Sequence, residues 1–186
     1  MCESFDDCIR DVEAAYKRLG HTMGWRFLTS PRATLSPKTR IALITLNPGG
    51  DREPPEHPRA SSDAGSSYCV ETWPGHAEGG APLQRQVQSL CRGLQRHLND
   101  DQPLPQFMAT AVLSAHFIPF RSPSFDALHN RQASIKFGRD LWTRILNQWR
   151  PRLILTIDRE SCSVLHGILM ANAGTRVTST QQFQTG

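Results

Sequence analysis

The segment Asn47-Pro48-Gly49-Gly50-Asp51 combines residue types that could act on a polar ligand. The amide of Asn47 can hold and orient a water molecule because it carries both donors and an acceptor. Pro48 stiffens the chain, and the two glycines let the backbone come close to a sugar-phosphate or a base. Asp51 could activate that water or cap the following turn. Because an ordinary strand-to-loop turn uses similar residues, the segment alone leaves both interpretations open.

A second polar segment begins at His116 and continues to Arg121 and Ser122. A neutral imidazole offers one donor and one acceptor, so His116 could read the edge of a base, although a loop carbonyl could equally satisfy it. Residues 84–152 contain nine arginines and one lysine against four aspartates, a net charge of +6, while the rest of the chain carries −2. This surplus suggests a polyanionic partner, with ordinary solvated helix faces as the alternative.

Both segments follow apolar stretches that predict strands. Apolar spacing, caps and turn residues predict helices over residues 5–19, 83–98 and 133–149, a further helix capped by Asp158 or Ser161, and strands over residues 41–46, 108–118 and 153–157. Residues 25–28 could form an edge strand or lead into the sheet, and residues 175–180 could form a fourth strand. The Gly-, Pro- and Ser-rich loop at 48–82 far exceeds the usual connection of about 4–6 residues, which favours a functional or disordered segment.

Alternation of strands and helices predicts an α/β fold, a three-layer α/β/α sandwich around a central, mainly parallel four-stranded sheet. The 186 residues suit a single domain over residues 1–186. Ligands of such sheets bind beyond the carboxyl ends of the strands. We therefore expect the ligand-binding residues among residues 47–51, 116–123 and 158–161 and among those that follow residue 180.

The order of these motifs resembles the uracil-DNA glycosylase superfamily, and most closely its branches with an Asn-Pro-Gly first motif. The strand ending in Leu46-Asn47-Pro48-Gly49-Gly50 is similar to the Gly-x-Asn-Pro-Gly strand end of those branches. Residues 111–123 are similar to the middle strand and its Pro-containing loop. Residues 150–157 and the following helix are similar to the third strand, where many members read RPKLIL. The ordered series covers roughly residues 25–169 and carries the resemblance, since each motif is short.

The resemblance implies a uracil-DNA glycosylase-like fold and hydrolysis of the N-glycosidic bond of a flipped base in DNA, with no cofactor. Asn47 would position the attacking water, with Asp51 as a second catalytic candidate. Base flipping also calls for an aromatic platform and a basic surface. The candidate base and DNA contacts are Pro48, Gly49, Gly50, Tyr68, Trp73, His116, Phe117, Phe120, Arg121 and Ser122. Core packing is the alternative for at least two of the four aromatic residues.

The sequence departs from that superfamily in two places. His116 stands where uracil-reading members have asparagine, so the base could be uracil or a modified base of the kind that phages use, with a role in DNA repair or antiviral defence. The final His-containing motif is missing, because residues 178–186 contain no histidine. Either this motif lies beyond the chain or the leaving-group stabiliser is lost. The alternatives are a non-catalytic nucleic-acid-binding domain and a small-molecule hydrolase or transferase.

Composition and cysteine spacing limit the cellular location and the metal or cluster sites that we expect for this protein. No apolar run approaches the length of a membrane span, and the acidic N-terminus differs from a signal peptide, so we expect a cytoplasmic monomer with no membrane partner. Five cysteines without a CxxC pair favour reduced thiols and argue against zinc, and their spacing does not match the iron–sulfur branches of the superfamily. His57, His76 and Glu78 have no recognised metal-binding spacing, so we expect no metal site.

Overall fold

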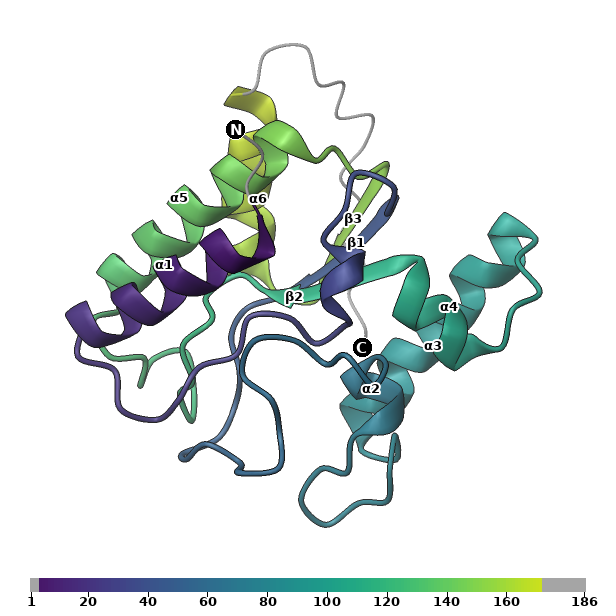
Figure 1. Ribbon diagram of the computed structural model, residues 1–186, viewed down its shortest axis with the longest axis horizontal. Coiled ribbons are helices and arrows are strands. Elements are labelled where there is room, and N and C mark those ends of the chain that lie inside the picture. Colours follow the sequence, from purple (N-terminus) through teal and green to yellow (C-terminus); the bar gives the residue numbers. More distant parts are fainter. Residues whose placement is uncertain (1–3, 172–186) are drawn as a thin grey trace.

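The computed structural model describes residues 4–171, and this part of the chain contains three strands and six α-helices (Figure 1). The strands are β1 (Ile41–Thr45), β2 (Val112–His116) and β3 (Leu153–Thr156). They pair in parallel in the order β2-β1-β3. In this register Thr45 lies beside His116, so β1 and β2 end at the same edge of the sheet.

The helices form a layer on each face of the sheet, one on the left of Figure 1 and the other on the right. One layer contains α1 (Phe5–Arg18), α5 (Arg131–Gln148) and α6 (Arg159–Ala171). The other contains α2 (Ser67–Val70), α3 (Pro82–Leu98) and α4 (Leu104–Thr110). The predicted α/β class with helices on both faces of a parallel sheet is confirmed. Within residues 4–171, no helix is both long enough and apolar enough to cross a bilayer.

The central strand β1 explains why the core has two halves. Its side chains alternate between faces, as in any strand. Ala42 and Ile44 pack into the cluster of α1, α5 and α6. Ile41 and Leu43 pack into the cluster of α2, α3 and α4. A strand buried on both faces needs the continuous apolar run that the sequence contains here.

The segment that precedes β1 lies along the outer edge of β2. The N–H of Arg26 donates to the carbonyl of Pro119 at 2.7 Å, and that of Thr29 donates to Ser114 at 2.9 Å. Residues 25 and 28 form only isolated antiparallel bridges, so the possible edge strand at 25–28 is a lead-in that borders the sheet. The long loop then lies against this lead-in, because the N–H of Phe27 donates to Arg59 at 3.0 Å.

Three predicted elements differ from the structure. The strand predicted at 108–118 is wrong in its first part, because α4 occupies 104–110 and β2 begins at Val112. A short apolar run does not separate a helix from a strand, and Pro105 fits the first turn of a helix. The loop at 48–82 contains the short helix α2. The sheet has three strands among the described residues, and the possible fourth strand at 175–180 lies outside them.

Candidate active site at the strand ends

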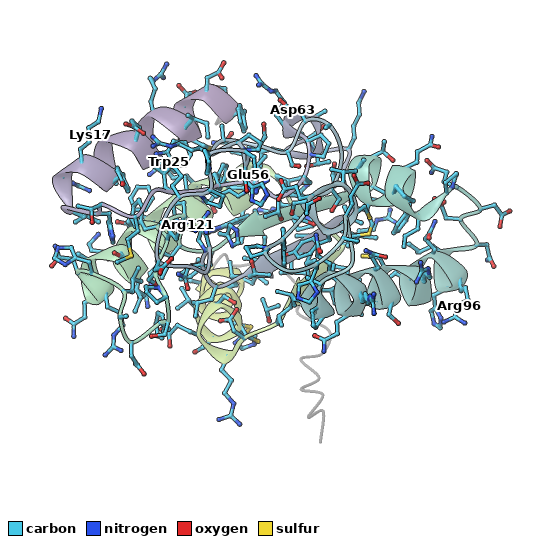
Figure 2. The ribbon with its side chains drawn as sticks, turned by 90° about the horizontal axis from the view of Figure 1, so that it is seen from below. Lys17, Trp25, Glu56, Asp63, Arg96 and Arg121 are labelled. Carbon is cyan, nitrogen blue, oxygen red and sulfur yellow. The ribbon has the colours of Figure 1, made fainter. Side chains whose placement is uncertain are left out.

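Backbone hydrogen bonds join the chain segments that leave β1 and β2. The N–H of Phe117 donates to Thr45 at 2.7 Å and that of Ile118 donates to Leu46 at 2.8 Å. The N–H of Ser122 donates to Pro48 at 3.1 Å, beside a parallel bridge between residues 49 and 122. The two polar segments identified in the sequence therefore run side by side. This edge lies under the long loop, on the side that faces the viewer in Figure 2.

Asn47 is held in a single orientation by the segment that leaves β2. Its Nδ2 atom donates to the carbonyl of Phe120 at 3.3 Å, to the hydroxyl of Ser122 at 2.8 Å and to the carbonyl of Pro48 at 3.1 Å. Because two of these partners are carbonyls, which only accept, the nitrogen of the amide must face them. Among the described residues none donates to Oδ1. The amide oxygen is thus a fixed acceptor, which is the group that would hold a water molecule.

His116 closes β2 as a buried neutral imidazole. Its Nδ1 atom lies 2.8 Å from the hydroxyl of Thr45, and its carbonyl accepts a hydrogen bond from the indole of Trp142 at 3.3 Å. Burial, followed by the positive charges of Arg26 and Arg121, lowers the pKa of His116 to about 3. At neutral pH the ring therefore carries no charge, and no described residue bonds to Nε2.

Arg121 lies between the two strand ends and carries an incompletely paired guanidinium. Its Nη1 donates to the carbonyl of Gly49, and its backbone N–H donates to Gly24 at 3.1 Å. Its Nε is buried and has no hydrogen-bond partner. Burial lowers the pKa of Arg121, with Arg26 as a second cause, and no described carboxylate forms an ion pair with it. The guanidinium therefore keeps donors that no described residue accepts from.

The two glycines beside Arg121 are exposed. A side chain at Gly49 would meet no atom within 4 Å, so the backbone there is open to an approaching group. Gly50 has a φ of 102°, which glycine adopts far more readily than other residues, and a Cβ there would lie 3.4 Å from Arg121 Nη1. The open backbone and the guanidinium therefore share one small area of surface.

A second charged group lies beneath the long loop. Arg26 and Glu71 are both buried and form a two-pronged ion pair, with Nη1 donating to Oε2 at 3.0 Å and Nη2 to Oε1 at 2.5 Å. Arg26 Nε also donates to the carbonyl of Leu28 at 3.1 Å. His57 Nδ1 lies 3.7 Å from Glu71 Oε2, and the indole of Trp73 donates to the same oxygen at 3.4 Å. This pair attaches the loop to the edge of the sheet.

The four aromatic candidates differ in exposure. Phe117 and Phe120 are fully buried in the core, and Phe120 stacks on His21 with 4.2 Å between ring centroids. Tyr68 is also buried, and burial raises the pKa of its hydroxyl. Trp73 alone is half-exposed, and it meets Tyr68 edge-on at 5.9 Å. Of the four rings, only Trp73 offers surface for stacking in this conformation.

The remaining candidates lie apart from Asn47. Asp51 is exposed, and no hydrogen bond joins it to Asn47 in the described structure.

Among residues 4–171, no group of three histidine, cysteine or acidic side chains could hold a metal ion. The four described cysteines, residues 8, 69, 91 and 162, form no disulfide. The other basic residues of the arginine-rich region lie on α3, on α5 and before β3, and Figure 2 shows Arg96 at the far end of α3 from Arg121.

Sequence reasoning missed Arg26, Glu71 and Thr45. Arg26 did give a signal, because it is a charged residue inside the aromatic and apolar stretch of residues 25–28. A buried cation requires an acidic partner. That partner is 45 positions away in the sequence, within a loop that also contains other acids, so the pair could not be identified before the fold was known.

A surface depression on the described part of the chain contains none of these residues. It lies at the carboxyl end of α3 and is lined by Arg92, Arg96 and Asp101 among others.

Comparison with protein-family models, curated proteins and solved structures finds no match to this chain. The resemblance to the uracil-DNA glycosylase superfamily therefore rests on the short motifs alone.

Proposed function

We propose that this chain hydrolyses the N-glycosidic bond of a flipped base in DNA, either uracil or a modified base, in a fold completed to four strands as in the uracil-DNA glycosylase superfamily. The observation that carries the proposal is the orientation of Asn47. Three hydrogen bonds fix its amide nitrogen and leave Oδ1 as an acceptor at the carboxyl end of β1. Such ends are where open α/β sheets bind ligands.

In this proposal Asn47 Oδ1 accepts a hydrogen bond from the attacking water. This bond orients the water so that a lone pair of the water oxygen points at the anomeric carbon of the sugar. The sugar develops positive charge as the bond to the base breaks, so a weakly basic amide can suffice when the water is well placed. The oxygen of the water bonds to the anomeric carbon and the water releases one proton to solvent, while the departing base takes the electrons of the broken bond and gains one proton from solvent. His116, neutral at pH 7, offers Nε2 to the edge of the base.

A second candidate is a nucleic-acid-binding domain without turnover. The observation that favours it concerns the side chain of Asn47: among the described residues, no carboxylate or imidazole is hydrogen-bonded to it and could accept the proton of the water. Under this alternative, Asn47 contributes only to the shape of the strand end.

The test is a base-release assay on DNA containing uracil, mismatches or phage-type modified cytosines. We expect Asn47→Ala to reduce release by about 100-fold or more, the typical effect of removing one polar group that acts in the transition state. His116→Ala should change which base is released. Asn147→Ala, at an exposed position on α5, is the matched control and should behave like the wild type.

DNA affinity measured on the same variants separates the two candidates. A glycosylase should lose turnover in Asn47→Ala while binding DNA as before. If the wild type binds DNA but releases no base from any member of the panel, the binding domain is the correct interpretation. If the wild type releases no base and binds no DNA even at low salt concentration, the chain acts on neither DNA nor its bases.

A further inference from the structure

The inference concerns Arg121, whose guanidinium is only partly satisfied by the protein. Nη1 donates to the carbonyl of Gly49, whereas Nε is buried without a partner. Buried donors are almost always paired, and an unpaired one in a native fold requires an explanation. An anion bound to the exposed part of this half-buried guanidinium would offset the cost of leaving Nε unpaired.

The charges around Arg121 make that acceptor an anion. Arg26 is the cation whose charge lowers the pKa of Arg121, and Glu71 already neutralises Arg26 through two hydrogen bonds. His116 carries no charge at neutral pH. Glu53 and Glu71 act on Arg121 only from a distance, and neither pairs with it. The guanidinium is therefore an uncompensated positive charge at a partly buried position, and its planar fork suits an anion with two oxygens.

The neighbouring backbone sets the shape of the group that can enter. Gly49 is exposed, and a Cβ on it would touch nothing within 4 Å, so a tetrahedral group can rest against this turn beside the guanidinium. The same turn continues directly from Asn47, the residue proposed to hold the water. An anion bound here would lie next to the sugar on which that water acts.

We infer that Arg121 and the Gly49–Gly50 turn bind a phosphate group of the substrate, with Arg121 as the positioning residue. This inference rests on the proposed function in placing the phosphate next to the scissile nucleotide. Two kinds of ligand carry such a phosphate group: a nucleic-acid strand, in which it is a phosphodiester, and a free nucleotide, in which it is a monoester. Arg121 holds the phosphate, and the distance along the sugar-phosphate chain then places the anomeric carbon near Asn47.

The experiment measures binding of a fluorescent single-stranded DNA oligonucleotide by anisotropy over a salt series. The full chain is used as wild type, Arg121→Gln, Arg121→Lys and the matched control Arg96→Gln, which removes an exposed arginine at the far end of α3. We expect Arg121→Gln to weaken binding about tenfold. Its slope of log affinity against log salt should fall by about 0.7, the value for one phosphate contact on single strands.

Arg121→Lys keeps the charge but not the fork, so it should keep the slope and recover only part of the affinity. If Arg121→Gln does not fold, as judged by circular dichroism, this comparison of lysine with arginine decides in its place. Equal affinity and slope for the Arg121 variants and Arg96→Gln would overturn the inference.

Competition with a deoxynucleoside monophosphate identifies the source of the phosphate. Displacement of the oligonucleotide from wild type supports a monoester, and lack of displacement alongside weak binding by Arg121→Gln supports a diester. These readouts are independent of turnover. Loss of binding in Arg121→Gln with no base release from wild type would leave the phosphate site standing and reject the glycosylase. Base release by the wild type together with unchanged binding in the Arg121 variants would reject the phosphate site and leave the glycosylase proposal standing.

Discussion

Two arginines near the strand ends differ in how the protein accommodates a positive charge that is partly or wholly removed from solvent. Arg26, beneath the long loop, is buried and has its charge matched by both carboxylate oxygens of Glu71. Arg121, between the exits of β1 and β2, is half-buried, and within residues 4–171 its guanidinium bonds to one partner, the backbone carbonyl of Gly49. The two are close enough that the charge of Arg26 lowers the pKa of Arg121.

The difference separates a region that serves the fold from the region that is proposed to serve a ligand. The Arg26–Glu71 pair joins residues 45 positions apart and fastens the loop to the sheet, so its satisfied bonds contribute to structure. Arg121 leaves a buried donor unpaired, which costs stability, and the exposed part of its guanidinium lies next to exposed glycines. Stability and binding can therefore be separated by substitution in these two regions.

The largest expected effect is on the buried pair. Glu71→Gln removes the charge that neutralises Arg26 and leaves a cation in the interior, so we expect a loss of about 3–5 kcal/mol in the free energy of unfolding. Urea denaturation measures this loss. Glu53→Gln is the matched control, because Glu53 pairs with Arg59 in a half-exposed position, and its cost should stay below about 1 kcal/mol.

A double substitution tests the reason for that loss. Arg26→Met combined with Glu71→Leu removes both charges, so it should cost less than Glu71→Gln alone. If the double variant is the less stable of the two, the pair stabilises through its geometry and not by neutralising a charge. The contrast with Arg121 would then lose its basis.

We expect pH to have an intermediate effect on the free energy of unfolding, because the charges of both arginines help to lower the pKa of His116. Its folded pKa of about 3 lies below the unfolded value of about 6.5, so the unfolded chain binds a proton that the folded chain excludes in this range. Stability should fall as the pH drops from 6.5 towards 3, by about 2 kcal/mol between pH 6.5 and 4.5. His21, whose pKa burial lowers to about 4, contributes in the same direction.

Denaturation at several pH values measures this dependence. His116→Asn cannot bind the proton, so the variant should lose the part of the dependence that belongs to His116 while His21 supplies the rest. An unchanged pH profile in that variant would show that His116 is not held neutral. The charge of the two arginines would then be better shielded than the structure indicates.

The smallest effect is expected at Arg121. Arg121→Met removes one hydrogen bond to a carbonyl and also removes an unmatched, half-buried charge, so the two changes oppose each other. We expect the free energy of unfolding to stay within about 1 kcal/mol of wild type. Because Arg121 lowers the pKa of His116, the same variant should raise that pKa, which NMR titration of the ring detects. A loss as large as that of Glu71→Gln would remove the distinction between the two regions.

The sequence predicted the regular elements well where local signals agree. The capping box at Ser4 and Asp7 starts α1 as expected, and the apolar run of residues 41–46 forms the central strand. Asp158 accepts a hydrogen bond from the N–H of Ser161 at 2.7 Å, so the expected cap of α6 is present. Local chemistry sufficed here because each signal lies within a few residues of the structure that it determines.

Predictions failed or stayed open where the outcome depends on distant residues. An apolar run fits both α4 and a strand, and only packing against β2 and α3 decides between them. Of the candidate aromatics, the burial of Phe117 and Phe120 depends on α1 and α5, which the local sequence does not reveal. The proximity of the two polar segments was predicted correctly, because parallel strands place their carboxyl ends at one edge.

The sequence by itself determined the alternation of strands and helices, the position of Asn47 after the central strand and the surplus of arginine. The tertiary structure decided which of those arginines is neutralised, which way the amide of Asn47 faces and which aromatic rings remain exposed. The physical reason is that helix caps and apolar periodicity act over a few residues. Charge pairing, burial and pKa depend on atoms that only the fold brings together.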